Sequence, residues 1–168
     1  MGGQPLNAVA SGRRHDHATT LWCLPFGLLI GMILGPMSGL IASIAFVFGG
    51  LWLSPDLDTC SNASHRWGLL AWIWWPYRRL IPHRSLWSHG PLLGTATRLL
   101  LLLTWTAGVV LLLPGLNVAA WLGSVHRTIQ EHPQPSAAIL LGLEASTWLH
   151  LLLDGDPWPA EWTRRRRR

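Results

Sequence analysis

The stretch ATTLWCLPFGLLIGMILGPMSGLIASIAFVFGGLWL, residues 18–53, decides the fold of this chain. It contains two apolar runs, Ala18–Leu34 and Met37–Leu53, which only Gly35 and Pro36 separate. A helix of roughly 17 to 25 apolar residues crosses a bilayer, so each run is long enough to span. Because a Gly-Pro pair favours a turn, the two runs are predicted to form a tight antiparallel hairpin of helices.

Two further apolar runs follow, Leu92–Leu113 and Ala137–Leu153. The composition agrees with a membrane protein, because 49% of the residues are apolar and only 12% are charged. The 12 tryptophans, against one tyrosine and three phenylalanines, favour the bilayer–water interface. The sequence therefore predicts an all-α integral membrane bundle of about four transmembrane helices. We expect one multispan domain at 18–154, preceded by a cytoplasmic segment at 1–17 and followed by a basic tail at 155–168.

The two cysteines, Cys23 and Cys60, form no Cys-x-x-Cys pair, which argues against thiolate zinc sites and against a disulfide framework. The first apolar run has no clear cleavage site, so it is expected to stay in the mature protein. Glycines 27, 31 and 35 recur at four-residue spacing, which favours close helix packing in lipid. The general abundance of glycine in bilayer helices explains this spacing equally well.

The segment RWGLLAWIWWPYRRL, residues 66–80, gathers tryptophans and arginines around Pro76. This pattern predicts a short helix that lies in the membrane interface. The alternative is a lid or packing segment without lipid contact.

Four spans place both termini and the loop 54–91 on one side of the membrane, and residues 114–136 in a loop on the other. The chain has no lysine, and the opposite loop carries only Arg127 among its arginines. The positive-inside rule therefore predicts a plasma (inner) membrane protein with both termini in the cytoplasm. The terminal run RRRRR, 164–168, is expected to contact anionic lipid headgroups of the bilayer, and no nucleic-acid partner is expected.

The same topology brings polar residues at the ends of all four spans to the cytoplasmic side. Neutral imidazoles and carboxylates hold divalent metals where thiolates are absent. The candidate ligands are His15 or His17, a choice the pattern leaves open, with Asp56, Asp58, His83, His89, His150 and Asp154. They suffice for one metal ion or two.

The spacing of these residues suits a shared site. His150 and Asp154 are four apart, so both project from one face of a helix. The two aspartates of SPDLD are two apart and can point the same way. His83 and His89, six apart, meet only if a turn lies between them.

Other polar residues receive separate interpretations. His65 is expected to be an interfacial cap, and His126 and His132 are expected to be surface residues of the opposite side. Arg98 and Glu144 lie about 14 Å below the cluster at 1.5 Å per helical residue. We expect an ion pair between them, and the alternative is that Arg98 binds a substrate phosphate.

Four stretches of the chain carry a family resemblance: SGRRHDHAT (11–19), SPDLDT (54–59), RWGLLAWIWWPYRRLIPHRSLWSHGPLLGT (66–95) and HLLLD (150–154). In them the chain resembles a bacterial family of metal-binding membrane proteins that is common in cyanobacteria. More distantly it is similar to the YdjM-like inner-membrane metal-dependent hydrolases, whose histidine segment is one residue shorter. The resemblance implies a multispan protein with a bound metal. The matching positions are His15, Asp56, Asp58, His83, His89, His150 and Asp154.

The leading functional hypothesis is a metal-dependent hydrolase that acts at the cytoplasmic face on a phosphate- or lipid-linked substrate. Asp58 or Asp154 would serve as the general base, and the metal would be Zn, Mn or Fe. The alternative is a non-catalytic metal-binding or metal-transport membrane protein. A third hypothesis is a structural membrane module in which the histidines cap helices.

Overall fold

A computed structural model describes residues 12–155, and every regular element in that range is helical. Four helical segments are long and apolar enough to cross a membrane, which confirms the predicted class. The residues outside that range include the arginine run that is expected to contact lipid headgroups. The elements are α1 (Gly12–Leu34), α2 (Pro36–Leu51), η1 (Pro55–Asp58), α3 (Asn62–Arg66), η2 (Gly68–Trp74), α4 (Trp75–Leu80), α5 (Leu86–His89), α6 (Leu93–Leu112), α7 (Val118–Glu131) and α8 (Pro133–Leu153).

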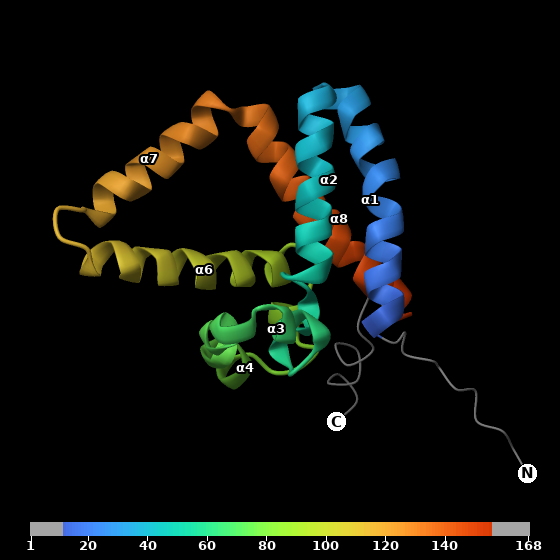
Figure 1. Cartoon of the computed structure of the whole chain (residues 1–168), viewed down its shortest axis with the longest axis horizontal. Helices are drawn as coiled ribbons and strands as arrows, with labels where there is room; N and C mark the ends of the chain where they lie inside the picture. Colours follow the sequence, from blue (N-terminus) through green and yellow to red (C-terminus); the bar gives the residue numbers. More distant parts are fainter. Residues whose placement is uncertain (1–11, 156–168) are drawn as a thin grey trace, which may run out of the picture.

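The predicted hairpin is formed by α1 and α2, which run antiparallel side by side (Figure 1). Gly35 takes a positive φ of 93° in the turn, and Pro36 begins α2. The helices cross closely at Gly39, where an added Cβ would lie 2.5 Å from the Gly27 carbonyl oxygen and 2.7 Å from the Gly31 Cα. Gly27 and Gly31 therefore permit the close packing, whereas Gly35 permits the turn.

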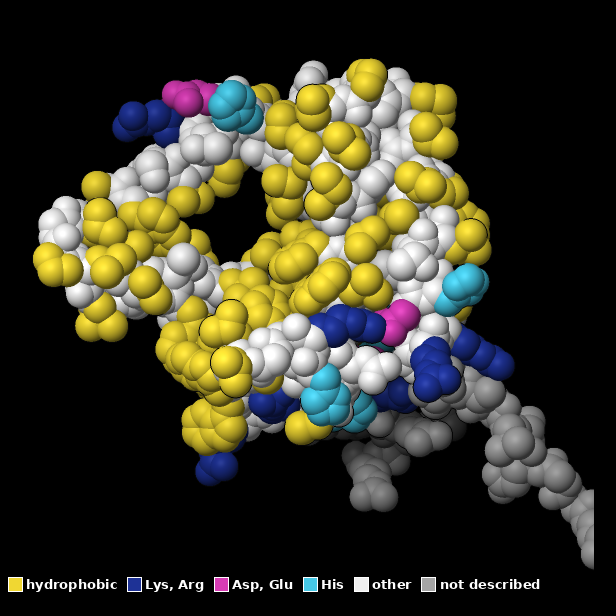
Figure 2. Space-filling view, in the orientation of Figure 1, with side chains coloured by type: hydrophobic (Ala, Val, Ile, Leu, Met, Phe, Trp, Pro, Cys, Tyr) yellow, Lys and Arg dark blue, Asp and Glu magenta, His cyan; other side chains and the backbone are white. Residues whose placement is uncertain are grey.

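The remaining long helices are arranged around this hairpin. α8 packs along α2 and meets α1 at the end of the molecule where both termini of the described chain lie (Figure 1). α6 leaves the base of α2 and diverges from α8, and α7 joins their far ends (Figure 1). Hydrophobic side chains cover much of the long helices, and arginines and histidines gather near the lower end (Figure 2). An apolar surface of this extent is rare on a water-exposed monomer.

Residues 114–136 were expected to be a loop, and that expectation is wrong, because most of them form α7. The Asn117 side chain caps the helix by accepting a 3.0 Å hydrogen bond from the Ala120 amide. Its larger apolar residues recur at helical spacing, so one face is apolar although no long apolar run exists. These residues are Val118, Trp121, Leu122, Val125 and Ile129.

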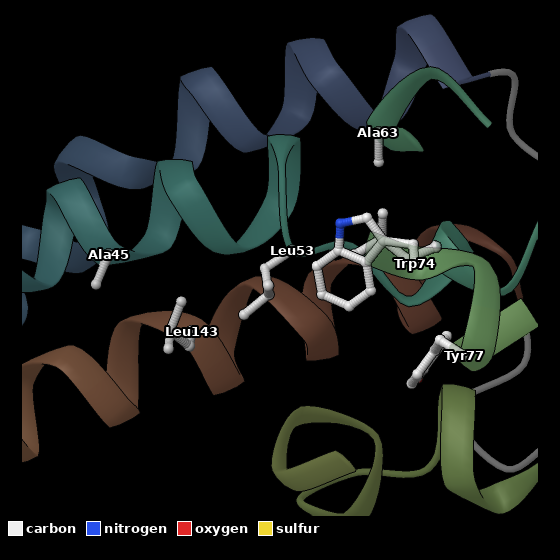
Figure 3. Packing of buried hydrophobic residues seen from close by; sticks show 7 residues of the cluster. Ala45, Leu53, Ala63, Trp74, Tyr77 and Leu143 are labelled. Carbon is white, nitrogen blue, oxygen red and sulfur yellow. The ribbon is translucent and has the colours of Figure 1, made fainter. Parts of the chain in front are cut away.

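The tryptophan-rich segment forms two short helices, η2 and α4, beneath α6 (Figure 1). Trp74 is fully buried and points into the space between Leu53, Ala63 and Tyr77 (Figure 3). On the outer side Leu69 is 95% exposed, and Trp75 is exposed as well. One face thus anchors the segment in the core, and the other is free to meet an interface.

Candidate metal centre

All seven residues implied by the resemblance meet at one end of the bundle. They come from the first turns of α1, the short helix η1, the loop around α5, and the end of α8. Contacts of 3.0 to 3.6 Å link them in one continuous chain in which imidazoles and carboxylates alternate. The order is His15, Asp154, His150, Asp56, His89, Asp58 and His83.

Local sequence explains how each element presents its side chains. Pro55 begins η1, and the Ser54 hydroxyl accepts a hydrogen bond from the Asp56 amide, which turns the chain sharply after α2. The turn that His83 and His89 require is supplied by α5, where Ser85 and Ser88 form a capping box. The two imidazole rings consequently lie 5.6 Å apart, centroid to centroid.

Three side chains form the set best suited to hold an ion. The Nε2 atoms of His89 and His150 lie 3.6 and 3.5 Å from the same carboxylate oxygen, Oδ1 of Asp56. Both nitrogen atoms are buried and have no hydrogen-bond partner. A buried polar atom without a partner is costly, and a bound cation would satisfy both of them at once. The donor set of two imidazoles and one carboxylate therefore fits a divalent transition metal.

A second set shares His150 with the first and adds His15 and Asp154. The His15 ring stacks on the His150 ring with centroids 4.1 Å apart, and its Nε2 lies 3.0 Å from Asp154 Oδ1. Because His150 Nε2 can bind one ion only, the two sets do not make two independent three-ligand sites. His15 is buried whereas His17 is exposed, so the structure favours His15 in the choice between them.

Asp58 holds the histidines rather than facing the three-ligand set. Its side chain is 0% exposed, it accepts a 3.1 Å hydrogen bond from the Arg84 amide, and it lies 3.0 Å from His83 Nδ1. Its other contact is to Nδ1 of His89, at 3.3 Å. A carboxylate on the far nitrogen of a ligating histidine fixes the ring and its tautomer. Asp58 is thus suited to orient His89.

The carboxylates also set the protonation of the site. Burial alone would lower the pKa of His89, but the nearby carboxylates of Asp56 and Asp58 outweigh it and raise that pKa above its usual value. Burial would raise the pKa of Asp154, but His15 and His150 hold it well below the usual range. Without a cation the site therefore retains protons on imidazole beside ionised carboxylate.

Metal affinity is expected to fall as the pH falls. The His89 imidazole must lose its proton before Nε2 can bind a cation, and its raised pKa keeps that proton to a higher pH than in a free histidine. Affinity is therefore full above the raised pKa and is lost as the pH falls through it. Competition with a chelator at about pH 8 and about pH 6 would measure this change. Equal affinity at both pH values would contradict the assignment of His89.

A polar cavity of about 210 Å³ opens beside the three-ligand set. His15, Asp56 and His150 form part of its wall. The wall also includes Asn62 and Arg66, and Arg66 pairs with Asp16 and donates to the Leu51 carbonyl oxygen at 2.9 Å. The centre is therefore accessible to a small polar molecule from one side.

Arg98 and Glu144 lie beneath the centre, but they do not form the expected direct ion pair. Arg98 is fully buried and donates to the Ser88 carbonyl oxygen and to the hydroxyls of Thr95 and Thr147. Thr95 in turn donates to Glu144 at 2.6 Å. Thr95 thus stands between the two charged groups, and the network ties α5 to α6 and α8.

The other histidines of the described chain, at positions 17, 65, 126 and 132, are exposed and belong to neither ligand set. Sequence reasoning missed the polar residues that support the ligands. Ser54 lies 3.5 Å from Nδ1 of His150, and Ser88 lies 3.0 Å from Nδ1 of His89. The signal available for both was their position, directly beside predicted ligands in SPDLD and WSHG.

Comparison with known proteins gives one relative and one family. One relative, an uncharacterized protein of Aquifex aeolicus (strain VF5), is 40% identical over 57 residues. That match covers 33% of this chain and 40% of the relative, so the chain spans less than half of its length. No solved structure matches the chain. A family model matches residues 10–166, nearly the whole sequence and all of the centre. The chain therefore belongs to the family described as "Uncharacterized metal-binding protein (DUF2227)".

Proposed function

We propose that this protein is a membrane-embedded, metal-dependent hydrolase that acts at the cytoplasmic face on a phosphate- or lipid-linked substrate. The observation that carries the proposal is the pair of buried, unpartnered Nε2 atoms of His89 and His150, which face Asp56 beside a polar cavity. Structural metal sites are closed by four protein ligands, whereas catalytic sites have three and an open position. Three possible ligands, two of which line a cavity, favour catalysis.

A divalent cation, when bound, supplies Lewis-acid chemistry that lowers the pKa of water and stabilises negative charge on a phosphoryl or acyl oxygen. His89, His150 and Asp56 would hold it, and Zn, Mn and Fe all accept this donor set. The choice among the three metals rests on elemental analysis of the purified protein.

The proton-transfer role falls to Asp154 acting with His15. His15 lines the cavity, and its Nε2 lies 3.0 Å from Asp154 Oδ1, an arrangement that lets the carboxylate orient the imidazole. Asp58, the other candidate base, is enclosed by His83, His89 and the Arg84 amide. We therefore assign Asp58 a positioning role.

A non-catalytic metal-binding or transport protein is the competing function. Transport needs ligands along a path through the bilayer. Within residues 12–155 both groups of three possible ligands lie at the same end of the bundle. These groups therefore offer no second metal-binding position along a path across the membrane. This observation favours the hydrolase.

The test is a screen of the purified, metal-loaded protein against phosphomonoesters, phosphodiesters and ester lipids. Asp154→Asn should retain metal and lose roughly 100-fold or more in turnover, because the His15 base would lose the carboxylate that orients it. His17→Ala, an exposed neighbour of His15, is the matched control and should behave as wild type. If the protein binds one metal per chain and hydrolyses none of these substrates, the hydrolase is rejected and the non-catalytic metal-binding function is supported.

Both termini are predicted to be cytoplasmic, because most arginines are expected at the end of the helix bundle that carries the metal centre. Alkaline phosphatase fused after Arg168 should be inactive, since that enzyme requires the periplasm. The same reporter inserted at Gly115, in the turn between α6 and α7, should be active. The reverse pattern would invert the orientation.

A further inference from the structure

An apolar groove lies between α1 and α8, on the parts of these helices that are long and apolar enough to span a membrane. α1 and α8 meet at the end that carries the metal centre and separate away from it (Figure 1), and Phe46 of α2 forms part of the groove wall. The groove has a volume of about 630 Å³, within the range of roughly 300 to 1,000 Å³ that is typical of small-molecule sites. Its walls include Trp22, Phe26, Phe46, Ala145, Leu149 and Leu152.

The position of the groove indicates what occupies it. All three helices that line it are long and apolar enough to span a bilayer, so its open side faces hydrocarbon. On α1 the groove extends from Leu29 to Trp22, about 10 Å at 1.5 Å per residue, and Trp22 lies seven residues, two helical turns, from His15 on the same face of the helix. A hydrocarbon chain seated there would have its polar end toward the end of the bundle that carries the metal centre.

Basic side chains near the metal centre suit an anionic head. Arg13 and Arg14 are exposed on the first turn of α1, and a guanidinium nitrogen of Arg84 lies 3.9 Å from Asp154. Cationic side chains at the level of the headgroups attract phosphate-bearing lipids.

We propose that the groove binds an acyl chain of a phosphate-bearing membrane lipid and presents its head to the metal centre. This inference rests on the proposed function in naming that lipid as the substrate class. Binding in the groove is nevertheless measurable without turnover, so the two proposals can fail separately.

The experiment uses the full chain, metal-loaded, in nanodiscs of neutral phosphatidylcholine that contain phosphatidic acid with a photoreactive diazirine on its acyl chain. Cross-linked peptides are identified by mass spectrometry. Label should concentrate on residues 22–29 and 145–152, and an excess of unlabelled phosphatidic acid should reduce it about tenfold. The same excess of phosphatidylcholine should not reduce it.

Two tryptophan variants give a matched comparison. Ala145→Trp fills the groove and should lower labelling there about tenfold. Ile44→Trp places the same side chain in a separate apolar hollow between α1 and α2 and should leave labelling unchanged. Metal content, measured on each sample, reports whether the centre is intact. If Ala145→Trp does not fold, competition by unlabelled phosphatidic acid in the wild-type protein decides whether the groove binds the lipid.

Label spread evenly over the groove and the hairpin face around Ile44, and not reduced by unlabelled phosphatidic acid, would show contact with bulk lipid only. This result would overturn the proposal that the groove binds a specific lipid. Competition by phosphatidylcholine as strong as by phosphatidic acid would overturn the anionic head. Competed label in the groove of a protein that hydrolyses nothing would refute the hydrolase and retain the lipid site.

Discussion

Asp56→Asn is expected to lower metal affinity by at least about 10- to 100-fold, the loss seen even for groups that only support a ligand. The Asp56 carboxylate is the one acidic group that faces the unpartnered Nε2 atoms of both His89 and His150. The substitution removes its charge and keeps its shape, so the helices around it should pack as before. Metal per chain, measured at equal folded yield in detergent, tests this expectation.

Asp16→Asn is the matched control, because Asp16 lines the same cavity but belongs to neither ligand set. It pairs with Arg66, so its loss should perturb the cavity wall and leave the metal in place. Full metal in Asp56→Asn would remove Asp56 from the centre. If His89→Ala and His150→Ala also kept full metal, the proposed centre would be wrong.

Arg98→Met is expected to destabilise the protein by about 3 to 5 kcal/mol, the range for removing one partner of a buried charged network. Arg98 is fully buried, and its loss leaves the Ser88 carbonyl oxygen and the hydroxyls of Thr95 and Thr147 without their donor. Because Ser88 adjoins His89, metal content should fall too. Unfolding in detergent, followed by circular dichroism, measures the stability.

Arg127→Met on the exposed α7 is the control, and its effect should stay within about 0.5 kcal/mol. Arg98→Lys should give an intermediate loss, since it keeps the charge but not the forked donors. Normal stability of Arg98→Met together with lost hydrolysis would instead favour the interpretation in which Arg98 binds a substrate phosphate.

The sequence predicted that the candidate ligands lie close together because membrane topology is a strong constraint. Once four spans are recognised, the ends of helices far apart in sequence must meet on one side, and this brought His15, Asp56 and His150 together. The hairpin was predictable because Gly35 and Pro36 favour a turn between two runs that are each long enough to span. Both predictions needed only the length and the direction of the spans.

What the sequence could not predict depends on rotation about the helix axes and on partial burial. Arg98 and Glu144 were expected at equal depth, but depth does not reveal that Thr95 lies between them. Spacing likewise did not distinguish Asp56, which faces the free imidazole nitrogens, from Asp58, which orients His89. α7 was missed because its apolar residues occupy one face and form no long run.

The most direct test of the metal centre is anomalous diffraction from crystals of the metal-loaded protein, recorded at the absorption edge of the bound element. We expect one peak per chain, about 2.0 to 2.2 Å from Nε2 of His89, Nε2 of His150 and a carboxylate oxygen of Asp56. A peak held by exposed histidines such as His17 or His65, with none at His89 and His150, would contradict the account.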